Sequence, residues 1–226
     1  MTTSRPVDLS WLQMQLPLAA ELFCVAHDER SGRCRVYRRV LGLGLAAGLL
    51  ADLVMCGRLD ISRDGVRVVS LDRLPDGLVD SALSVLVAQP QHREVPTWLA
   101  YLGQGAAVSV AEWLAAAGVW RRERRRRFGL AQTQQRYVPA DVNVEYWRAH
   151  RLSGPLTSGE RIGLRDAVLV GLVAAIGLAD AVLWDPDTRG WGLDRITAEV
   201  DHLPRPLRHL VAFTETAVGD AVLAPH

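Results

Sequence analysis

The 226-residue sequence contains no lysine, so all 26 of its basic residues are arginine. Such a chain-wide absence is typical of codon bias in a high-GC bacterial genome. The three cysteines, Cys24, Cys34 and Cys56, are odd in number and widely spaced, which supports neither a disulfide framework nor a zinc site. The first residues also lack the apolar stretch of a signal peptide. These absences predict a protein of the reducing cytoplasm, with no metal and no cofactor.

Long apolar runs are missing as well. The two longest, at 40–56 and 167–184, are each interrupted by an aspartate. Both fall short of the roughly 20 uninterrupted apolar residues that a bilayer-spanning helix needs. They therefore predict buried helices rather than membrane spans. Asp52, the aspartate of the first run, is expected to pair with an arginine, for which Arg58 and Arg195 are the two candidates.

The pattern of apolar residues predicts a mainly α fold, a single-domain helical bundle around a central buried helix, with two small β-hairpins. The central helix is the run 40–57, which is apolar on nearly every face. Its glycine-rich stretch 42–48 imitates a dinucleotide-binding fingerprint, but that fingerprint works only inside a βαβ unit. We therefore expect Gly44 and Gly48 to allow close packing between helices.

Local signals predict the neighbouring elements. Alternating apolar residues around Asp64 and Gly65 indicate a β-hairpin. Asp76 is a candidate N-cap for the helix that follows. Two further amphipathic helices are expected, one beginning near Trp98 and the other over 108–117.

The most informative segment is 120–130, Trp-Arg-Arg-Glu-Arg-Arg-Arg-Arg-Phe-Gly-Leu, which predicts the second hairpin. It carries six arginines and one glutamate, although the formal charge of the whole chain is only +1. Such a patch attracts the phosphates of a membrane surface or a nucleic acid. The apolar Phe128 and Leu130 favour the membrane, and the near-neutral chain argues against a dedicated nucleic-acid binder. Two questions stay open. The run can instead be a solvated helix extension or loop, and Trp120 can wedge helices together, cap the domain surface or sit at a lipid interface.

Several landmarks follow one another in a definite order. They are Glu21-Leu22 before a polar turn at 28–32, Leu-Ala-Asp-Leu-x-x-x-Gly-Arg-Leu at 50–59, Leu-Pro-Asp-Gly-Leu at 74–78, the helix led by Trp98, and the basic hairpin. Over roughly residues 12–220 this order resembles the Golgi phosphoprotein 3 family, including its bacterial members. The resemblance implies an N-terminal tail over 1–11 and a Golgi phosphoprotein 3-like helical domain over 12–222.

The resemblance also implies a hydrophobic β-hairpin that dips into a membrane. Eukaryotic members of the family are peripheral Golgi adaptors that recognise a phosphoinositide headgroup and bind the tails of glycosyltransferases. Their headgroup pocket uses a tryptophan and three arginines. In this sequence the tryptophan position holds Tyr37, and the arginine positions hold Ala46, Gln104 and Ala107.

The leading hypothesis is a non-enzymatic adaptor, cytoplasmic and peripherally associated with an anionic lipid membrane, with a protein partner besides. The predicted lipid-headgroup residues are Tyr37, Arg121, Arg122, Arg124, Arg125, Arg126 and Arg127, and the predicted membrane-insertion residues are Phe128 and Leu130. No catalytic residue is predicted, because the sequence contains none of the common nucleophile, P-loop or metal-ligand arrangements. The alternative is a soluble small-molecule-binding protein or a cyclase-like biosynthetic enzyme, with an apolar cavity near Tyr37, Ala46 and Ala107.

Overall fold

The computed structural model describes residues 15–28, 30–126, 133–143, 146 and 151–223. The protein is mainly helical with two small antiparallel hairpins, so the predicted fold class is confirmed. The helices are α1 (Leu18–Ala26), α2 (Arg38–Met55), α3 (Gly77–Ala88), α4 (Val95–Ala116), α6 (Ser153–Ser158), α7 (Leu164–Ala175), α8 (Ala179–Val182), α9 (Pro186–His202) and α10 (Arg205–Leu223). The strands are β1 (Leu59–Ser62), β2 (Gly65–Val68), β3 (Trp120–Arg126) and β4 (Thr133–Pro139).

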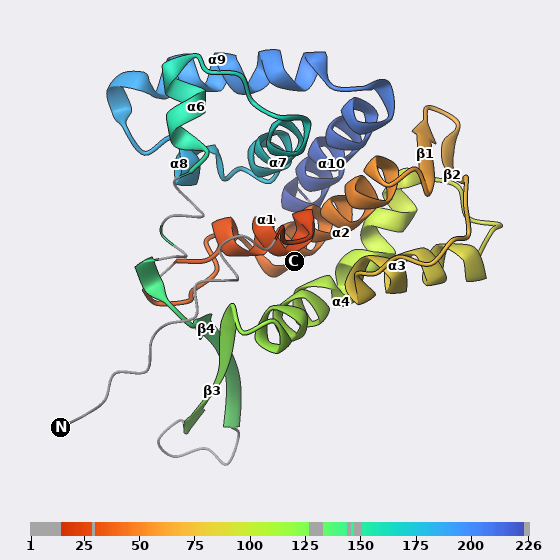
Figure 1. Ribbon diagram of the computed structural model, residues 1–226, viewed down its shortest axis with the longest axis horizontal. Coiled ribbons are helices and arrows are strands. Elements are labelled where there is room, and N and C mark those ends of the chain that lie inside the picture. The colour runs from red at the N-terminus through yellow and green to blue at the C-terminus, as the bar shows by residue number, and fades with distance from the viewer. Residues whose placement is uncertain (1–14, 29, 127–132, 144–145, 147–150, 224–226) are drawn as a thin grey trace.

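Helix α2 is the central buried helix that the sequence predicts. Every residue from Val40 to Leu53 is buried, and α2 packs against α1, α4, α7 and α10. Figure 1 shows α1 and α2 between a layer of α3 and α4 and a layer of α6, α7, α9 and α10. A single cluster of buried side chains extends from Leu16 to Ala221, so the layers share one core. Among the residues described above, no helix has both the length and the apolar character to cross a bilayer.

Glycines set the distances between α2 and its neighbours. A Cβ atom added to Gly48 would lie 2.7 Å from the backbone nitrogen of Ala19 in α1, and one added to Gly44 would strike a side chain at the end of α7. The predicted close packing at both glycines is therefore confirmed. A Cβ atom on Gly42 would likewise overlap the carbonyl oxygen of Gly103 in α4. The stretch belongs to a helix crossing, and it is not part of a βαβ unit.

Helix α4 corrects one prediction. Two separate helices were expected near Trp98 and over 108–117, but Val95–Ala116 is one uninterrupted helix. The glycines between the two predicted pieces weaken the helical pattern of the sequence. One of them, Gly103, lies at the contact with α2, where packing outweighs the intrinsic preference against glycine.

The local signals of the first hairpin and of α3 are confirmed. In the first hairpin Ile61 pairs with Val66, and the turn places Gly65 at a φ of 114°, which suits glycine. The Asp76 carboxylate accepts hydrogen bonds from the backbone N–H groups of Leu78 and Val79, at 2.9 and 3.0 Å.

The predicted boundary between the tail 1–11 and the domain lies outside the described residues.

Candidate functional site

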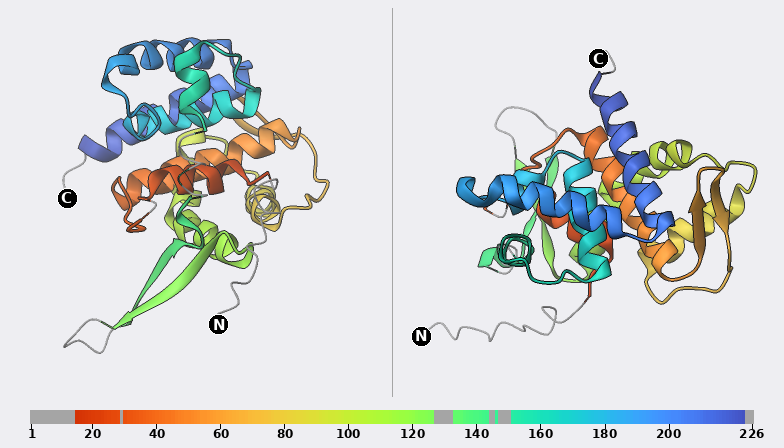
Figure 2. Two further views of the ribbon diagram at one scale, coloured as in Figure 1. Left: turned by 60° about the vertical axis from the view of Figure 1, so that its left-hand side comes forward. Right: turned by 90° about the horizontal axis from the view of Figure 1, so that it is seen from above.

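The basic segment forms the second hairpin. Strands β3 and β4 pair antiparallel along their whole length, from Trp120 opposite Pro139 to Arg126 opposite Thr133. The paired strands carry six arginines and one glutamate, a net charge of +5. Figure 1 and the left view of Figure 2 show this hairpin projecting away from the helical layers. Its charge is therefore held out from the body of the protein.

Trp120 anchors the base of the hairpin in the core. Its side chain is only 1% exposed, and its ring meets the rings of Phe23 and His27 edge-on, with centroids 5.1 and 5.4 Å away. This burial overturns the alternative that Trp120 sits at a lipid interface and confirms that it wedges between elements. Burial lowers the pKa of His27 to about 4, so the imidazole is neutral at pH 7.

The arginines nearest the base make weak surface contacts. Arg121 lies 3.3 Å from Glu123, and Arg122 lies 3.5 Å from Glu112 in α4. Arg122 also donates to the hydroxyl of Tyr137 at 3.3 Å and lies 5.7 Å from the centre of its ring. Exposed ion pairs of this kind contribute about 0–1 kcal/mol, so both arginines can exchange these partners for an anionic ligand at little cost.

Five of the six predicted headgroup arginines of the segment lie on one strand. Besides Arg121 and Arg122, these are the arginines at 124–126 of β3. The sixth, Arg127, and the predicted insertion residues Phe128 and Leu130 lie in 127–132, outside the described residues. Their roles in lipid binding stay predictions.

A second basic cluster, which we call the basic turn, adjoins the hairpin and was not anticipated. The turn is residues 30–39, where five of ten residues are arginine and none is acidic. All five of these arginines are exposed. The turn packs against β4 so closely that a Cβ atom on Gly32 would lie 2.8 Å from the carbonyl oxygen of Tyr137. The local count of charges could have revealed the cluster, but its place beside the hairpin depends on a contact between distant parts of the chain.

Tyr37 lies within the basic turn and precedes the first residue of α2. Its side chain is 75% exposed and makes no hydrogen bond or ring contact with the other described residues. It lines a hollow of about 690 Å³ together with the ends of α7 and α10, where Val222 is also exposed. Cys34 lines the same hollow, and burial raises the pKa of its thiol.

The three positions at which the family carries arginines do not meet at one surface. Ala46 is completely buried in α2. Gln104 and Ala107 of α4 line a different cavity, of about 640 Å³, between α2, α4 and α10. The expected single cavity beside Tyr37, Ala46 and Ala107 is therefore not formed, because the bundle separates these residues into the core and two hollows.

Asp52 belongs to a buried ionic network, and its partner is neither Arg58 nor Arg195. Arg165 of α7 donates to one carboxylate oxygen of Asp52 at 2.8 Å, and the backbone N–H of Leu18 donates to the other at 2.7 Å. Burial raises the pKa of Asp52, and Arg165 opposes that shift. Because each carboxylate oxygen of Asp52 accepts a hydrogen bond, the arrangement ties α1, α2 and α7 together.

The same network includes Arg151, in the turn before α6. Glu21 of α1 accepts a hydrogen bond from Arg151, and Arg151 also donates to Asp166 of α7 at 2.7 Å. The nitrogen Nε of Arg165 lies 3.9 Å from a carboxylate oxygen of Glu21. The network therefore contains acidic and basic groups in nearly equal number, as a structural network of buried charges requires.

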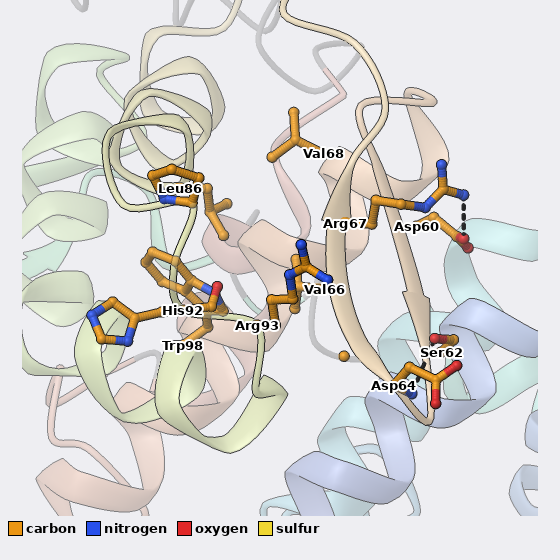
Figure 3. A pocket seen from close by; sticks show the side chains of 12 residues that line it. Asp60, Ser62, Asp64, Val66, Arg67, Val68, Leu86, His92, Arg93 and Trp98 are labelled. Carbon is orange, nitrogen blue, oxygen red and sulfur yellow. Dashed lines mark hydrogen bonds and ion pairs between the residues drawn. The ribbon is translucent and has the colours of Figure 1, made fainter.

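A further hollow, of about 400 Å³, separates the first hairpin from the loop between α3 and α4 (Figure 3). Its polar groups mostly bind one another. The carbonyl oxygen of Arg93 accepts from the backbone N–H of Val66 at 2.7 Å, and the indole of Trp98 donates to the carbonyl of His92 at 3.0 Å. The first bond fastens the hairpin to the loop, and the second fastens the loop to α4, so both give the hollow a structural role.

The protein is a helical bundle around one buried helix, and a buried tryptophan anchors its projecting basic hairpin. The family model for Golgi phosphoprotein 3 (GPP34) matches residues 18–222. The chain therefore belongs to the Golgi phosphoprotein 3 family, and this membership is consistent with a lipid-associated adaptor. A search of curated proteins gives no match.

Proposed function

We propose that this protein is a non-enzymatic adaptor that binds the surface of anionic membranes reversibly from the cytoplasm. The observation that carries the proposal is the charge of +5 on two paired strands that project from the body. Phosphate groups of an anionic leaflet are the complementary surface. The exposed arginines of the basic turn adjoin the hairpin and add to the attraction.

The hairpin divides the binding energy between two sources. Each arginine near an anionic leaflet contributes about 1 kcal/mol, so the six of segment 120–130 supply several. Burial of Phe128 and Leu130 in the acyl region would add about 1.5–3 kcal/mol each. The total suits reversible recruitment and falls short of permanent anchoring. Trp120 holds the hairpin to the core while these groups engage the lipid.

The exposed Tyr37 is the proposed headgroup contact within the basic turn. An aromatic ring that is 75% exposed between arginines suits the boundary between headgroups and water. The family's own arginine positions do not contribute a charge here, since they hold Ala46, Gln104 and Ala107. Attraction is therefore expected to follow the charge of the membrane rather than one phosphoinositide. A protein partner would complete the role of an adaptor.

Co-sedimentation with vesicles tests the proposal directly. The full chain is mixed with neutral phosphatidylcholine vesicles and with vesicles that contain increasing fractions of phosphatidylserine. Binding should rise with the anionic fraction and fall as salt is added, because salt screens exposed charges over about 8–10 Å. Equally poor binding to both kinds of vesicle would reject the proposal.

The cyclase-like alternative receives no support from the described residues. It requires one apolar cavity beside Tyr37, Ala46 and Ala107, and these residues lie in separate places. The buried carboxylate of Asp52 pairs with Arg165 and Leu18, as expected of a structural acid.

A further inference from the structure

One edge of strand β2 is only partly paired. The backbone N–H of Val69 donates to Arg58, the residue before β1, at 2.8 Å, so alternate residues along β2 direct their backbone groups toward β1. Val66 and Val68 lie between them and direct their backbone groups away from β1. The N–H of Val66 donates to the carbonyl of Arg93 at 2.7 Å, whereas the N–H of Val68 has no backbone partner among the described residues. An unpaired edge of this kind is a template for another strand.

The free part of this edge opens into the hollow of about 400 Å³ between the first hairpin and the loop that leads to α4 (Figure 3). Val66 and Val68 line one side of the hollow, and Leu86 of α3 and Trp98 of α4 line the other. Val66, Leu86 and Trp98 are buried, and Val68 is half-buried. An aliphatic side chain placed beside Val68 would therefore contact apolar atoms.

Arg93 brings an unpaired positive charge to the same hollow. Its side chain is exposed and extends from the loop toward β2 (Figure 3). Its guanidinium group forms no ion pair or hydrogen bond with another described residue. Two acidic residues also line the hollow, but Asp60 pairs with Arg67 at 2.8 Å, and Asp64 is not within ion-pair distance of Arg93. The unpaired charge suits an anion that enters beside β2.

We infer that this hollow binds the carboxyl-terminal end of an extended peptide, which joins the edge of β2 as a short third strand. The main chain of Arg93 already occupies the place beside Val66, so the added strand must end there. The end beside a guanidinium group is the carboxylate, because the ammonium group of an amino terminus would be repelled. This order makes the peptide antiparallel to β2.

The last residue of the peptide would lie opposite Val68. Its N–H would donate to the carbonyl of Val68, and one carboxylate oxygen would accept from the N–H of Val68. The other oxygen would face Arg93 in a charge-assisted hydrogen bond. The last side chain would share a face of the sheet with Val68, near Leu86, so an aliphatic residue such as leucine is expected there. Strand addition and capture of a terminal carboxylate are both recurring modes of peptide recognition.

This inference deepens the proposed function, because it gives the chemistry of the adaptor's protein partner, a chain with a free and aliphatic carboxyl terminus. The adaptor role of that partner rests on the proposed function, but peptide binding itself needs neither a membrane nor the basic hairpin. Figure 1 shows β1 and β2 far from β3 and β4. A peptide at β2 and a membrane at β3 can therefore be bound at the same time.

Matched peptides separate the contributions of the carboxylate, the side chain and the strand. The probe is the hexapeptide Gly-Ser-Gly-Ser-Thr-Leu with an amino-terminal fluorescein and a free carboxyl terminus, and its anisotropy is followed as the full chain is added without lipid. It should bind roughly tenfold more tightly than the same peptide with a terminal amide or with a terminal glycine. Equal affinity for the acid and the amide would overturn the inference. Competition by N-acetyl-leucine as strong as that of the unlabelled hexapeptide would also overturn it, because the site would then take a small carboxylate without strand pairing.

Single substitutions locate the site. Arg93→Gln should bind the acid and the amide equally, whereas Arg93→Lys should keep a preference for the acid. The matched control, Arg63→Gln, removes an exposed arginine of the same hairpin that does not line the hollow, and it should bind the acid like the wild type. An Arg93→Gln variant that still prefers the acid would refute the assignment.

Two measurements test the pairing with β2. Val68→Pro removes the N–H that faces away from β1, so it spares the bonds between the two strands and should abolish binding of the acid. If this variant does not fold, as judged by circular dichroism, hydrogen exchange of the wild type decides. The N–H of Val68 should exchange roughly tenfold more slowly when the peptide is bound, and an unchanged rate would contradict strand addition.

The outcomes are distinct from those of the vesicle experiment. A variant in which the arginines at 124–127 are glutamine should keep its affinity for the peptide while it loses vesicles. Loss of peptide binding in that variant, together with retention in Arg93→Gln, would place the peptide on the basic hairpin and overturn the inference. Peptide binding at β2 without vesicle binding would support the inference and reject the proposed membrane role alone.

Discussion

Removal of Arg165 should destabilise the fold more than any single change on the surface. Among the described residues, Arg165 is the one that forms an ion pair with Asp52, whose side chain is only 7% exposed. It also approaches Glu21, whose side chain is 10% exposed. In Arg165→Met the Asp52 carboxylate keeps one hydrogen bond, from Leu18, but stays buried without a countercharge. Breaking a buried pair in this way costs about 3–5 kcal/mol. For a chain of this size the corresponding fall in melting temperature is roughly 6–20 °C.

The assay is urea and thermal unfolding followed by circular dichroism. The matched control is Arg67→Met, which removes the same kind of side chain from an exposed pair with Asp60, at 2.8 Å, where Arg67 is 71% exposed. The control should change the free energy of unfolding by about 0–1 kcal/mol. A second variant, Arg165→Met with Asp52→Leu, should recover part of the loss, because it removes the buried charge together with its partner. Equal stability of Arg165→Met and the control would refute the reasoning.

Three further predictions concern pH, helix packing and membrane insertion. The pKa of His27 is about 4 in the folded protein and 6.5 in the unfolded chain, so protonation favours unfolding. About 2 kcal/mol of stability should therefore be lost between pH 7 and pH 5. Urea unfolding at these two pH values should show a smaller loss for His27→Phe. Gly48→Ala should destabilise the folded protein by about 1–3 kcal/mol, because the new Cβ atom would meet the backbone of α1. Gly105→Ala lies in open space on α4 and should stabilise the folded protein by about 0.5–1 kcal/mol. Urea unfolding measures both changes. Joint replacement of Phe128 and Leu130 by serine should leave a weak vesicle association that 0.5 M salt abolishes, whereas salt-resistant sedimentation of this variant would contradict an insertion role for the two residues.

The elements that were predicted correctly depend on local chemistry. Asp76 is a short acidic side chain placed directly before a helix, and its carboxylate binds the first free backbone N–H groups whatever the tertiary structure. Gly65 tolerates the positive φ of a hairpin turn, and the alternating residues beside it need only one buried face. The long apolar run of α2 needs a position inside the protein, which predicts a central helix.

The elements that were missed depend on contacts between distant residues. Gly103 resembles a helix breaker in the sequence, but in the fold it lies against Gly42, where only a glycine allows the two helices to approach. The partner of Asp52 is 113 residues away, so spacing along the chain could not identify Arg165. Of the candidate site, the charge of the hairpin is predictable from composition, whereas the place of the basic turn depends on the contact of Gly32 with β4.

The most direct test of membrane binding is a comparison of two variants with the same loss of charge. In the first, the four arginines at 124–127 are replaced by glutamine. In the second, glutamine replaces four exposed arginines that lie outside the basic hairpin of β3 and β4. They are Arg63, Arg93, Arg161 and Arg205. Both are measured by co-sedimentation with phosphatidylserine vesicles, and circular dichroism checks that both are folded.

At about 1 kcal/mol for each arginine, the hairpin variant should lose about 4 kcal/mol of binding free energy, close to a thousandfold in affinity. The second variant should lose much less, since its arginines do not face the membrane in this account. Equal weakening of both would show that only net charge matters and would contradict a hairpin site. Unchanged binding of the hairpin variant would contradict the account altogether.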